Sequence, residues 1–136
     1  MSNTFTQVYV HVVFGVRGRE RLISDMWKKE LYDYISGIIH RQGQRLLIIN
    51  GIADHVHLLI SLRANLSISE LVRDIKSNSS RFIRERNFVS NFKWQNGYGV
   101  FSVSHSEITK VYDYIKNQEE HHRNSSFIKR NLNLFY

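Results

Sequence analysis

The sequence contains no cysteine. This absence excludes disulfide bonds and thiolate sites. Long hydrophobic runs are also missing, since no stretch approaches the roughly 18 apolar residues needed to cross a bilayer. The Met1–Thr4 start lacks the basic and apolar regions of a signal peptide. We therefore expect a cytoplasmic protein with no membrane partner.

The composition is basic, and it contains enough hydrophobic residues to form a core. The 136 residues carry a formal net charge of +7, with 42% hydrophobic and 12% aromatic residues. These fractions are typical of folded proteins rather than disordered ones, and the length favours a single domain over residues 1–136. The positive charge indicates an acidic partner, and nucleic acid is the commonest partner of a small basic domain.

Apolar periodicity predicts an α+β fold. The expected elements are a strand over 5–16, a helix from a cap at Ser24 or Asp25 to a stop at Gly43, strands over 45–52 and 55–62, a helix capped by Ser67 or Ser69, a strand over 97–103, and a last helix. This order is the ferredoxin-like pattern, an antiparallel sheet with two helices on one face. A short basic tail over 124–136 should be loosely ordered.

Several local signals refine this arrangement. Asn50-Gly51 is a hairpin-type pair, so it is either the turn itself or a bulge. Ser104 and Glu107 have the spacing of a capping box at the start of the last helix, and Tyr112 falls on the apolar stripe of that helix. In the connector over 87–96, packing into the core is favoured over base stacking for the three aromatic residues Phe88, Phe92 and Trp94.

A His-hydrophobe-His pair is the most informative motif. His55 and His57 lie two residues apart in a predicted strand, so they share one face while Val56 points to the other. Two imidazoles on one face can hold a metal ion; the alternative is a pair of hydrogen-bonded packing residues. Because the apolar face should meet the two helices, we expect the imidazoles on the opposite, accessible face.

The last helix carries a second polar group. Tyr114, Gln118 and His121 point away from Tyr112, since Tyr114 lies about 200° from it at 100° per residue. A phenol, a carboxamide and an imidazole there could complete a site whose other half is the His pair. The alternative is a polar, solvent-facing surface.

The helix predicted after Ser67 has a basic stripe opposite its apolar face. Arg73, Lys76 and Arg84 belong to this stripe. They form either a solvated helix surface or a face that contacts phosphates of a nucleic acid.

Taken together, the segments His55–His57, Gly97–Ser104 and Tyr114–His122 resemble the small single-tyrosine HUH transposases of bacterial insertion sequences, the IS200-like family. The likeness extends over nearly the whole chain. Its most specific part is the His pair combined with a tyrosine that is followed four residues later by a glutamine. The resemblance implies a metal-dependent DNA transposase that cleaves and rejoins single-stranded DNA at insertion-sequence ends.

The same resemblance implies a role for each site residue. His55, His57 and Gln118 would be metal ligands, and Tyr114 would be the nucleophile that forms a covalent 5′-phosphotyrosine. His121 is a possible helper by position only. Two imidazoles and one amide oxygen fit Mg²⁺ or Mn²⁺, and manganese suits the nitrogen ligands better.

The resemblance also implies partners, and two other functions stay open. A homodimer is expected in which the tyrosine helix of one subunit can serve the His pair of the other, together with recognition of DNA hairpins. One alternative is a related HUH nicking endonuclease acting on repeated palindromes. The other is a non-catalytic single-stranded nucleic-acid-binding module in which Tyr9, Tyr98 and Phe101 stack on bases.

Overall fold

The computed structural model describes residues 7–63 and 67–120. His121 and the tail over 124–136 lie outside the described residues. The elements in chain order are β1 (Val8–Gly15), η1 (Arg17–Arg19), α1 (Lys28–Arg41), β2 (Arg45–Ile52), β3 (His55–Leu62), α2 (Ile68–Glu85), β4 (Gly99–Val103), η2 (His105–Glu107) and α3 (Ile108–Lys116). No helix within the described ranges is long and apolar enough to cross a bilayer.

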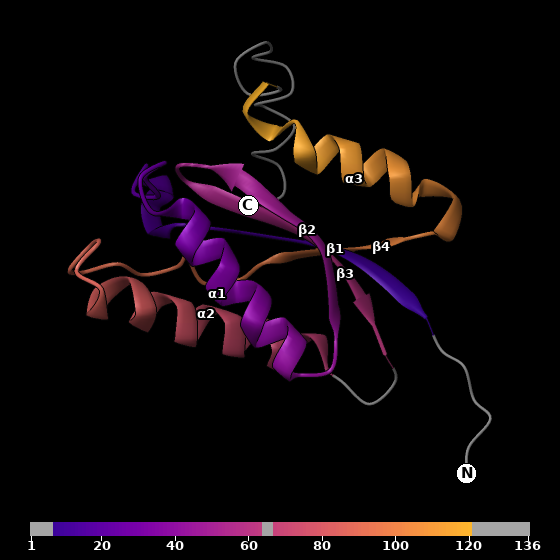
Figure 1. Ribbon diagram of the computed structural model, residues 1–136, viewed down its shortest axis with the longest axis horizontal. Helices are drawn as coiled ribbons and strands as arrows, with labels where there is room; N and C mark the ends of the chain where they lie inside the picture. Colours follow the sequence, from indigo (N-terminus) through magenta and orange to yellow (C-terminus); the bar gives the residue numbers. More distant parts are fainter. Residues whose placement is uncertain (1–6, 64–66, 121–136) are drawn as a thin grey trace.

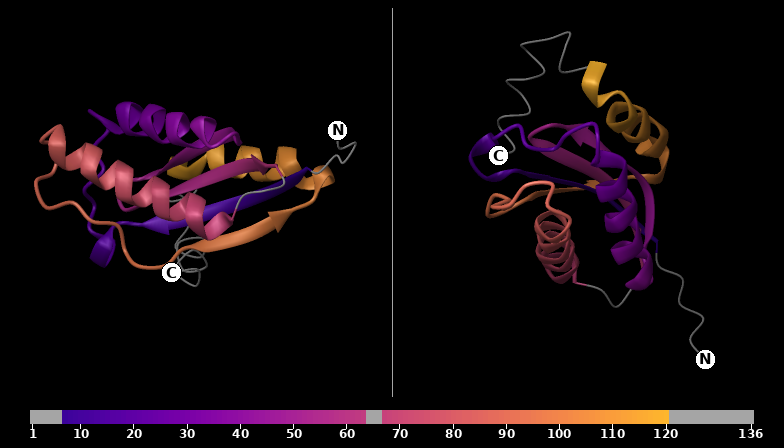
Figure 2. Two further views of the ribbon diagram at one scale, coloured as in Figure 1. Left: turned by 90° about the horizontal axis from the view of Figure 1, so that it is seen from below. Right: turned by 60° about the vertical axis from the view of Figure 1, so that its left-hand side comes forward.

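The four strands form one antiparallel sheet in the order β2-β3-β1-β4. In Figure 1, α1 and α2 lie together on one side of this sheet, and α3 lies on the other. The second view in Figure 2 shows the same separation. This is the ferredoxin-like arrangement predicted from the element order, with an additional helix after β4.

The main core lies between the sheet and the helices α1 and α2. Alternate residues of the central strands face it, so Val10, Val12, Val56 and Leu58 are almost completely buried. The apolar stripe of α2 meets them from above, including Ile75. Full burial of each such side chain stabilises the fold by about 1.5–3 kcal/mol.

Two predicted helix boundaries are confirmed. The Ser67 hydroxyl accepts a hydrogen bond from the Glu70 amide and caps α2. Gly43 follows α1 with a φ of 78°, the left-handed conformation that commonly terminates a helix. Ser24 does not cap α1 itself. Its hydroxyl accepts a hydrogen bond from the Met26 amide in the turn that precedes α1.

The interpretation of Asn50-Gly51 as a turn or bulge is wrong. Both residues lie inside β2 and pair with His57 and Val56. The hairpin turn is Ala53-Asp54, and the register shift falls between Leu46 and Ile48. Apolar residues flank the pair, Ile49 before it and Ile52 after it, so the strand extends to Ile52 before it turns.

Two predictions about the last helix are also wrong. No side-chain cap forms at Ser104, because the chain first makes the 3-10 turn η2, and the Ser104 hydroxyl pairs with that of Ser106 instead. Tyr112 is 37% exposed rather than part of the core. It lies on a nine-residue helix that contacts the sheet along one line, through Ile115, so the outer part of its apolar stripe stays at the surface.

The connector between α2 and β4 packs as predicted. Phe92 and Trp94 are buried in the core, and the Trp94 indole donates a 2.9 Å hydrogen bond to the buried Ser79 hydroxyl of α2. Phe88 stacks on Trp27 with ring centroids 4.9 Å apart. The connector therefore covers one end of the main core.

Candidate active site

The His pair lies on the sheet face that α3 covers. His55 and His57 are 0% and 1% exposed, so the expectation of an open, accessible face is wrong. The alternation along β3 was correctly predicted, but α3 packs across β2 and β3 on the second face and buries both rings. A buried polar ring is stable only when its nitrogens have suitable partners.

The Nδ1 atom of His55 is bound by the carboxylate of Asp54. Their distance is 2.6 Å, and Arg19 lies 3.6 Å from the other carboxylate oxygen. Burial raises the pKa of Asp54, but the hydrogen bond with His55 and the nearby Arg19 and Arg21 charges outweigh it and hold the pKa below its usual value. The charged carboxylate favours a proton on Nδ1 of His55, which puts the acceptor lone pair of the ring on Nε2.

The Nδ1 atom of His57 is bound by a second imidazole. His11 on β1 places its Nε2 atom 2.8 Å from it. Burial lowers the pKa of His11 to about 4, so this ring is neutral at physiological pH. Both imidazoles of the pair are thus held through the same ring atom by different partners.

The end of α3 is fixed to β2 by Asn50. Its side-chain amide donates to the carbonyls of Ile115 and Lys116, both at 3.0 Å. The helix breaks at Asn117 and a helical turn resumes at Gln118, so the last carbonyls of α3 need partners from outside the helix. An ion pair of 2.7 Å between Lys28 and Glu119 holds the following turn near α1.

This attachment places Tyr114 over the imidazoles. Its ring centroid lies 5.9 Å from that of His57 and 6.3 Å from that of His11. Burial raises the pKa of Tyr114, and a hydrogen bond with the Gln118 side chain acts in the opposite direction. The phenol is therefore protonated at neutral pH and lies beside nitrogen bases.

Gln118 is completely buried and has a spare oxygen. Its Nε2 atom donates to the Tyr114 carbonyl at 3.3 Å, while Oε1 accepts no hydrogen bond from any described residue. Across residues 7–63 and 67–120, the His, Cys, Asp and Glu side chains form no group of three that could hold a metal ion. A site here thus needs an amide oxygen, and Gln118 supplies one, so these residues fit the mixed nitrogen and oxygen set that Mg²⁺ or Mn²⁺ accepts.

A cavity of about 430 Å³ lies next to this cluster. It is bounded by the sheet below and by α3 above, and it reaches both His57 and Tyr114. The residues lining it are His11, Val13, His57, Phe101, Glu107, Lys110, Val111 and Tyr114. Its volume is in the range of cavities that hold small ligands, and the phenol and the imidazole both contribute to its lining.

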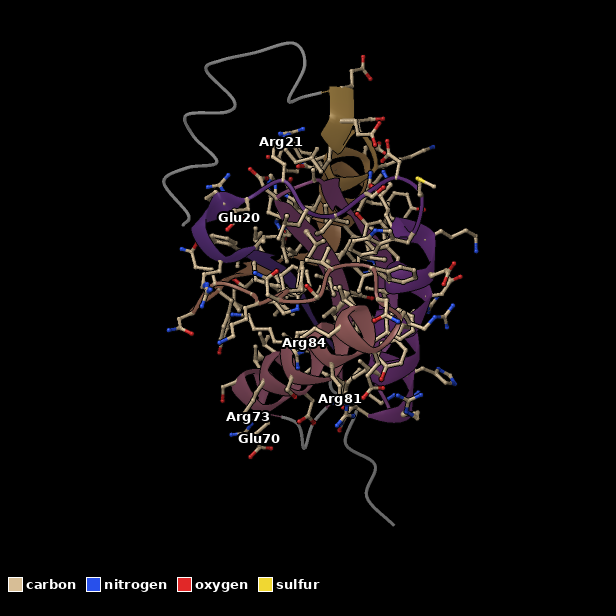
Figure 3. All side chains as sticks on the ribbon, turned by 90° about the vertical axis from the view of Figure 1, so that its left-hand side faces the viewer. Glu20, Arg21, Glu70, Arg73, Arg81 and Arg84 are labelled. Carbon is tan, nitrogen blue, oxygen red and sulfur yellow. The ribbon has the colours of Figure 1, made fainter. Side chains whose placement is uncertain are left out.

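The basic stripe of α2 borders a separate groove of about 480 Å³ beside the connector. Arg73 and Arg84 project from α2 in Figure 3. Lys76 donates to the carbonyls of Gln95 and Gly97, and Arg84 donates to that of Phe92, whereas Arg73 is exposed. Two of the three predicted cations therefore also hold the connector in place.

The structure brings His55, His57 and Tyr114 together and buries Gln118 beside them; His121 lies outside the described residues. Sequence reasoning did not place three supporting residues at the site, namely Asp54, His11 and Asn50. Asp54 could have been found as the carboxylate directly preceding a His ligand. His11 and Asn50 contact the site across strand pairs, so locating them required the register of the sheet.

Comparison with known proteins identifies the family. The family model described as "Transposase IS200 like" matches residues 4–118. The chain belongs to the IS200-like transposase family. It is thus a member of a family of DNA-processing enzymes.

Individual members of this family are moderately similar to the chain. The transposase for insertion sequence element IS200 of Salmonella typhimurium is 26% identical over 126 residues, covering 88% of this chain and 82% of the relative. The ISDra2 transposase TnpA of Deinococcus radiodurans is 24% identical over 121 residues, covering 84% and 86%.

Two solved structures have the same fold. A crystal structure of a Deinococcus radiodurans R1 protein assigned as a transposase superposes with a TM-score of 0.70 at 22% identity, covering 87% of this chain and 95% of the other. A REP-associated tyrosine transposase bound to a REP hairpin gives a TM-score of 0.63 at 14% identity, covering 86% and 70%.

Proposed function

We propose that this protein cleaves and rejoins single-stranded DNA at insertion-sequence ends, with Tyr114 as the nucleophile. The supporting observation is the position of the Tyr114 phenol, 5.9 Å between ring centroids from His57, at a cavity that both residues line. Family membership supports the same reaction class.

The proposed reaction exchanges one phosphate ester for another. The phenol oxygen of Tyr114 attacks phosphorus and forms a bond to it, while the bond from phosphorus to the 3′ oxygen of the preceding nucleotide breaks. The proton lost by the phenol is balanced by the proton that the leaving 3′ oxygen gains. The products are a 5′-phosphotyrosine and a free 3′-hydroxyl, and a later 3′-hydroxyl can reverse the step without ATP.

We also propose a divalent ion at this site. His55, His57 and Gln118 would hold Mg²⁺ or Mn²⁺ through two ring nitrogens and an amide oxygen. Such an ion, when bound, draws negative charge from a phosphate oxygen. The residues themselves orient the reactants: Asp54 and His11 hold the two imidazoles, and α3 holds the phenol above them.

The DNA partner is proposed to be single-stranded with hairpin ends. A solved structure of the same fold is bound to a REP hairpin, and the groove beside α2 offers a basic surface for phosphates. The homodimer expected from the resemblance stays a prediction. Within one chain, Tyr114 lies beside His57; exchange of the tyrosine helix between the two subunits also stays a prediction.

The test is formation of a covalent adduct. Wild type, Tyr114→Phe, His55→Ala and Gln118→Ala are incubated with labelled single-stranded DNA containing the element's end, its hairpin and Mn²⁺, and analysed on a denaturing gel. Tyr112→Phe is the matched control, because Tyr112 is an exposed tyrosine on the same helix. We expect an adduct with wild type and Tyr112→Phe, none with Tyr114→Phe, and at least about 100-fold less with His55→Ala.

An adduct that persists in Tyr114→Phe would exclude this tyrosine as the nucleophile. Tight DNA binding by wild type with no adduct, across several metals and end sequences, would instead favour the non-catalytic binding module. Cleavage of repeated palindromes without rejoining would favour the nicking endonuclease.

A further inference from the structure

The His11 ring is a partly buried polar group that the proposed reaction does not use directly. It lies on the central strand β1, opposite Leu59 of β3 and Phe101 of β4. Its neighbours are aromatic: ring centroids lie 5.0 Å away for His57, 6.0 Å for Phe101 and 6.3 Å for Tyr114. A histidine in this position needs a hydrogen-bonding partner to offset its burial.

That partner is His57, and the contact restricts both rings. His11 Nε2 and His57 Nδ1 are 2.8 Å apart, so only one of these two nitrogens carries the proton. If His57 is a metal ligand through Nε2, its proton must lie on Nδ1. His11 must then accept that proton's hydrogen bond through Nε2 and carry its own proton on Nδ1.

The neighbouring imidazole shows the same arrangement with a different partner. His55 is bound at Nδ1 by Asp54 at 2.6 Å, and a carboxylate can only accept when ionised. His57 has no adjacent carboxylate in its sequence, since its neighbours are Val56 and Leu58. The position that Asp54 fills for His55 is filled for His57 by His11, from another strand.

We propose that His11 is a positioning residue for the proposed metal site: it accepts the Nδ1–H of His57 and thereby fixes the tautomer and orientation that direct the Nε2 atom of His57 to a divalent cation. This inference rests on the proposed ligation by His57. It adds a residue whose contribution is to affinity for the ion, through hydrogen bonding rather than through contact with DNA.

The test separates hydrogen bonding from packing. His11→Gln places an acceptor oxygen where Nε2 lies, while His11→Leu fills similar space with no acceptor. His40→Leu is the matched control, since His40 is an exposed histidine on α1. Mn²⁺ affinity is measured by electron paramagnetic resonance without DNA, the His57 tautomer by ¹⁵N NMR of the metal-free protein, and folding by circular dichroism.

We expect the His57 proton on Nδ1 in wild type, His40→Leu and His11→Gln, with Mn²⁺ affinities within a few-fold of one another. In His11→Leu, the Nε2–H tautomer should appear and Mn²⁺ should bind about 10- to 100-fold more weakly. Unchanged affinity or tautomer in a folded His11→Leu would overturn the proposal, as would equal losses in His11→Gln and His11→Leu.

The wild-type tautomer decides the matter even if His11→Leu does not fold. A wild-type His57 that carries its proton on Nε2 overturns the role of His11. If wild type shows the Nδ1–H tautomer but binds no Mn²⁺, the proposed metal site itself is contradicted. The role of His11, which rests on that site, is then overturned by the binding measurement rather than by the tautomer.

Discussion

Gly51 lies where β2 approaches the start of β3 too closely for a side chain. A Cβ atom built on it would lie 2.1 Å from the His55 carbonyl oxygen and 2.8 Å from the Val56 Cα. Both contacts are with backbone, which cannot rotate out of the way as a side chain can. The close pairing of β2 with the start of β3 therefore depends on the absence of a side chain at position 51.

Gly51→Ala should destabilise the fold by about 2 kcal/mol or more, because the β2–β3 pairing must open to admit the methyl group. Gly37→Ala is the matched control: its Cβ would meet only an Arg41 side-chain atom at 3.5 Å, inside α1. That change should stabilise by about 0.5–1 kcal/mol. Urea unfolding followed by circular dichroism measures both, and equal stabilities would contradict the close approach.

At this scale, sequence reasoning found residues with distinctive chemistry and missed those with a supporting role. Strand and helix periodicity placed His55 with His57 and Tyr114 with Gln118 on shared faces. The resemblance to the family then combined the two pairs into one site. Asn50 was misread as part of a turn, because an Asn-Gly pair is a hairpin signal in isolation. Its actual use, binding the carbonyls at the end of α3, depends on packing between distant segments.

Among the elements, α3 is the one most dependent on its surroundings. A helix of nine residues is marginal by itself. It is held by the buried Ile115 and by the Asn50 amide, while the turn after it is held by the Lys28–Glu119 ion pair. Such a helix should open independently of the sheet.

Asn50→Asp should loosen α3 while leaving the sheet folded. The carboxylate cannot donate to the Ile115 and Lys116 carbonyls and adds a negative charge at the negative end of the helix. We expect amide exchange in α3 to become about 10- to 100-fold faster, measured by hydrogen–deuterium exchange with mass spectrometry. Asn78→Asp is the control, because Asn78 donates to a carbonyl within α2.

Unchanged exchange in α3, or equally fast exchange in β1 and β3, would contradict a role for Asn50 specific to this helix.

At the same scale, the order of elements and the face assignment of α1 and α2 could be predicted from periodicity. The placement of α3 over the His pair could not, since no local pattern states which face of a sheet a final helix will cover.

At the scale of the whole molecule, the distribution of positive charge is the feature that bears on the proposed binding of DNA. The net charge is +7, and the groove beside α2 is lined by the four basic residues Arg73, Lys76, Arg84 and Lys93 and, within the described part of the chain, by no acidic one. Contacts between such cations and phosphates release counterions, which makes binding dependent on salt.

Replacing Arg73, Lys76 and Arg84 by Gln should weaken binding of single-stranded DNA and reduce the slope of log K against log salt by about 2, since each lost phosphate contact contributes about 0.7. Fluorescence anisotropy at several salt concentrations measures the slope. The control is a second triple variant with the same change in net charge. It replaces by Gln three exposed cations on α1 and β2, namely Lys29, Arg41 and Arg45. Equal slopes for the two triple variants would assign the effect to net charge rather than to the groove.

The central position of β1 and β3 has a consequence for behaviour on warming. These two strands carry His11, His55 and His57, and each is hydrogen-bonded on both sides, by β4 and β2 as well as by one another. Strands in the centre of a sheet unfold last on heating, whereas a short helix that is held mainly by side-chain contacts unfolds locally at a lower temperature. As the temperature rises, the Tyr114 phenol should move away from the His55 and His57 rings while the sheet is still folded. Loss of the proposed DNA-cleavage activity should therefore begin below the melting temperature of the protein.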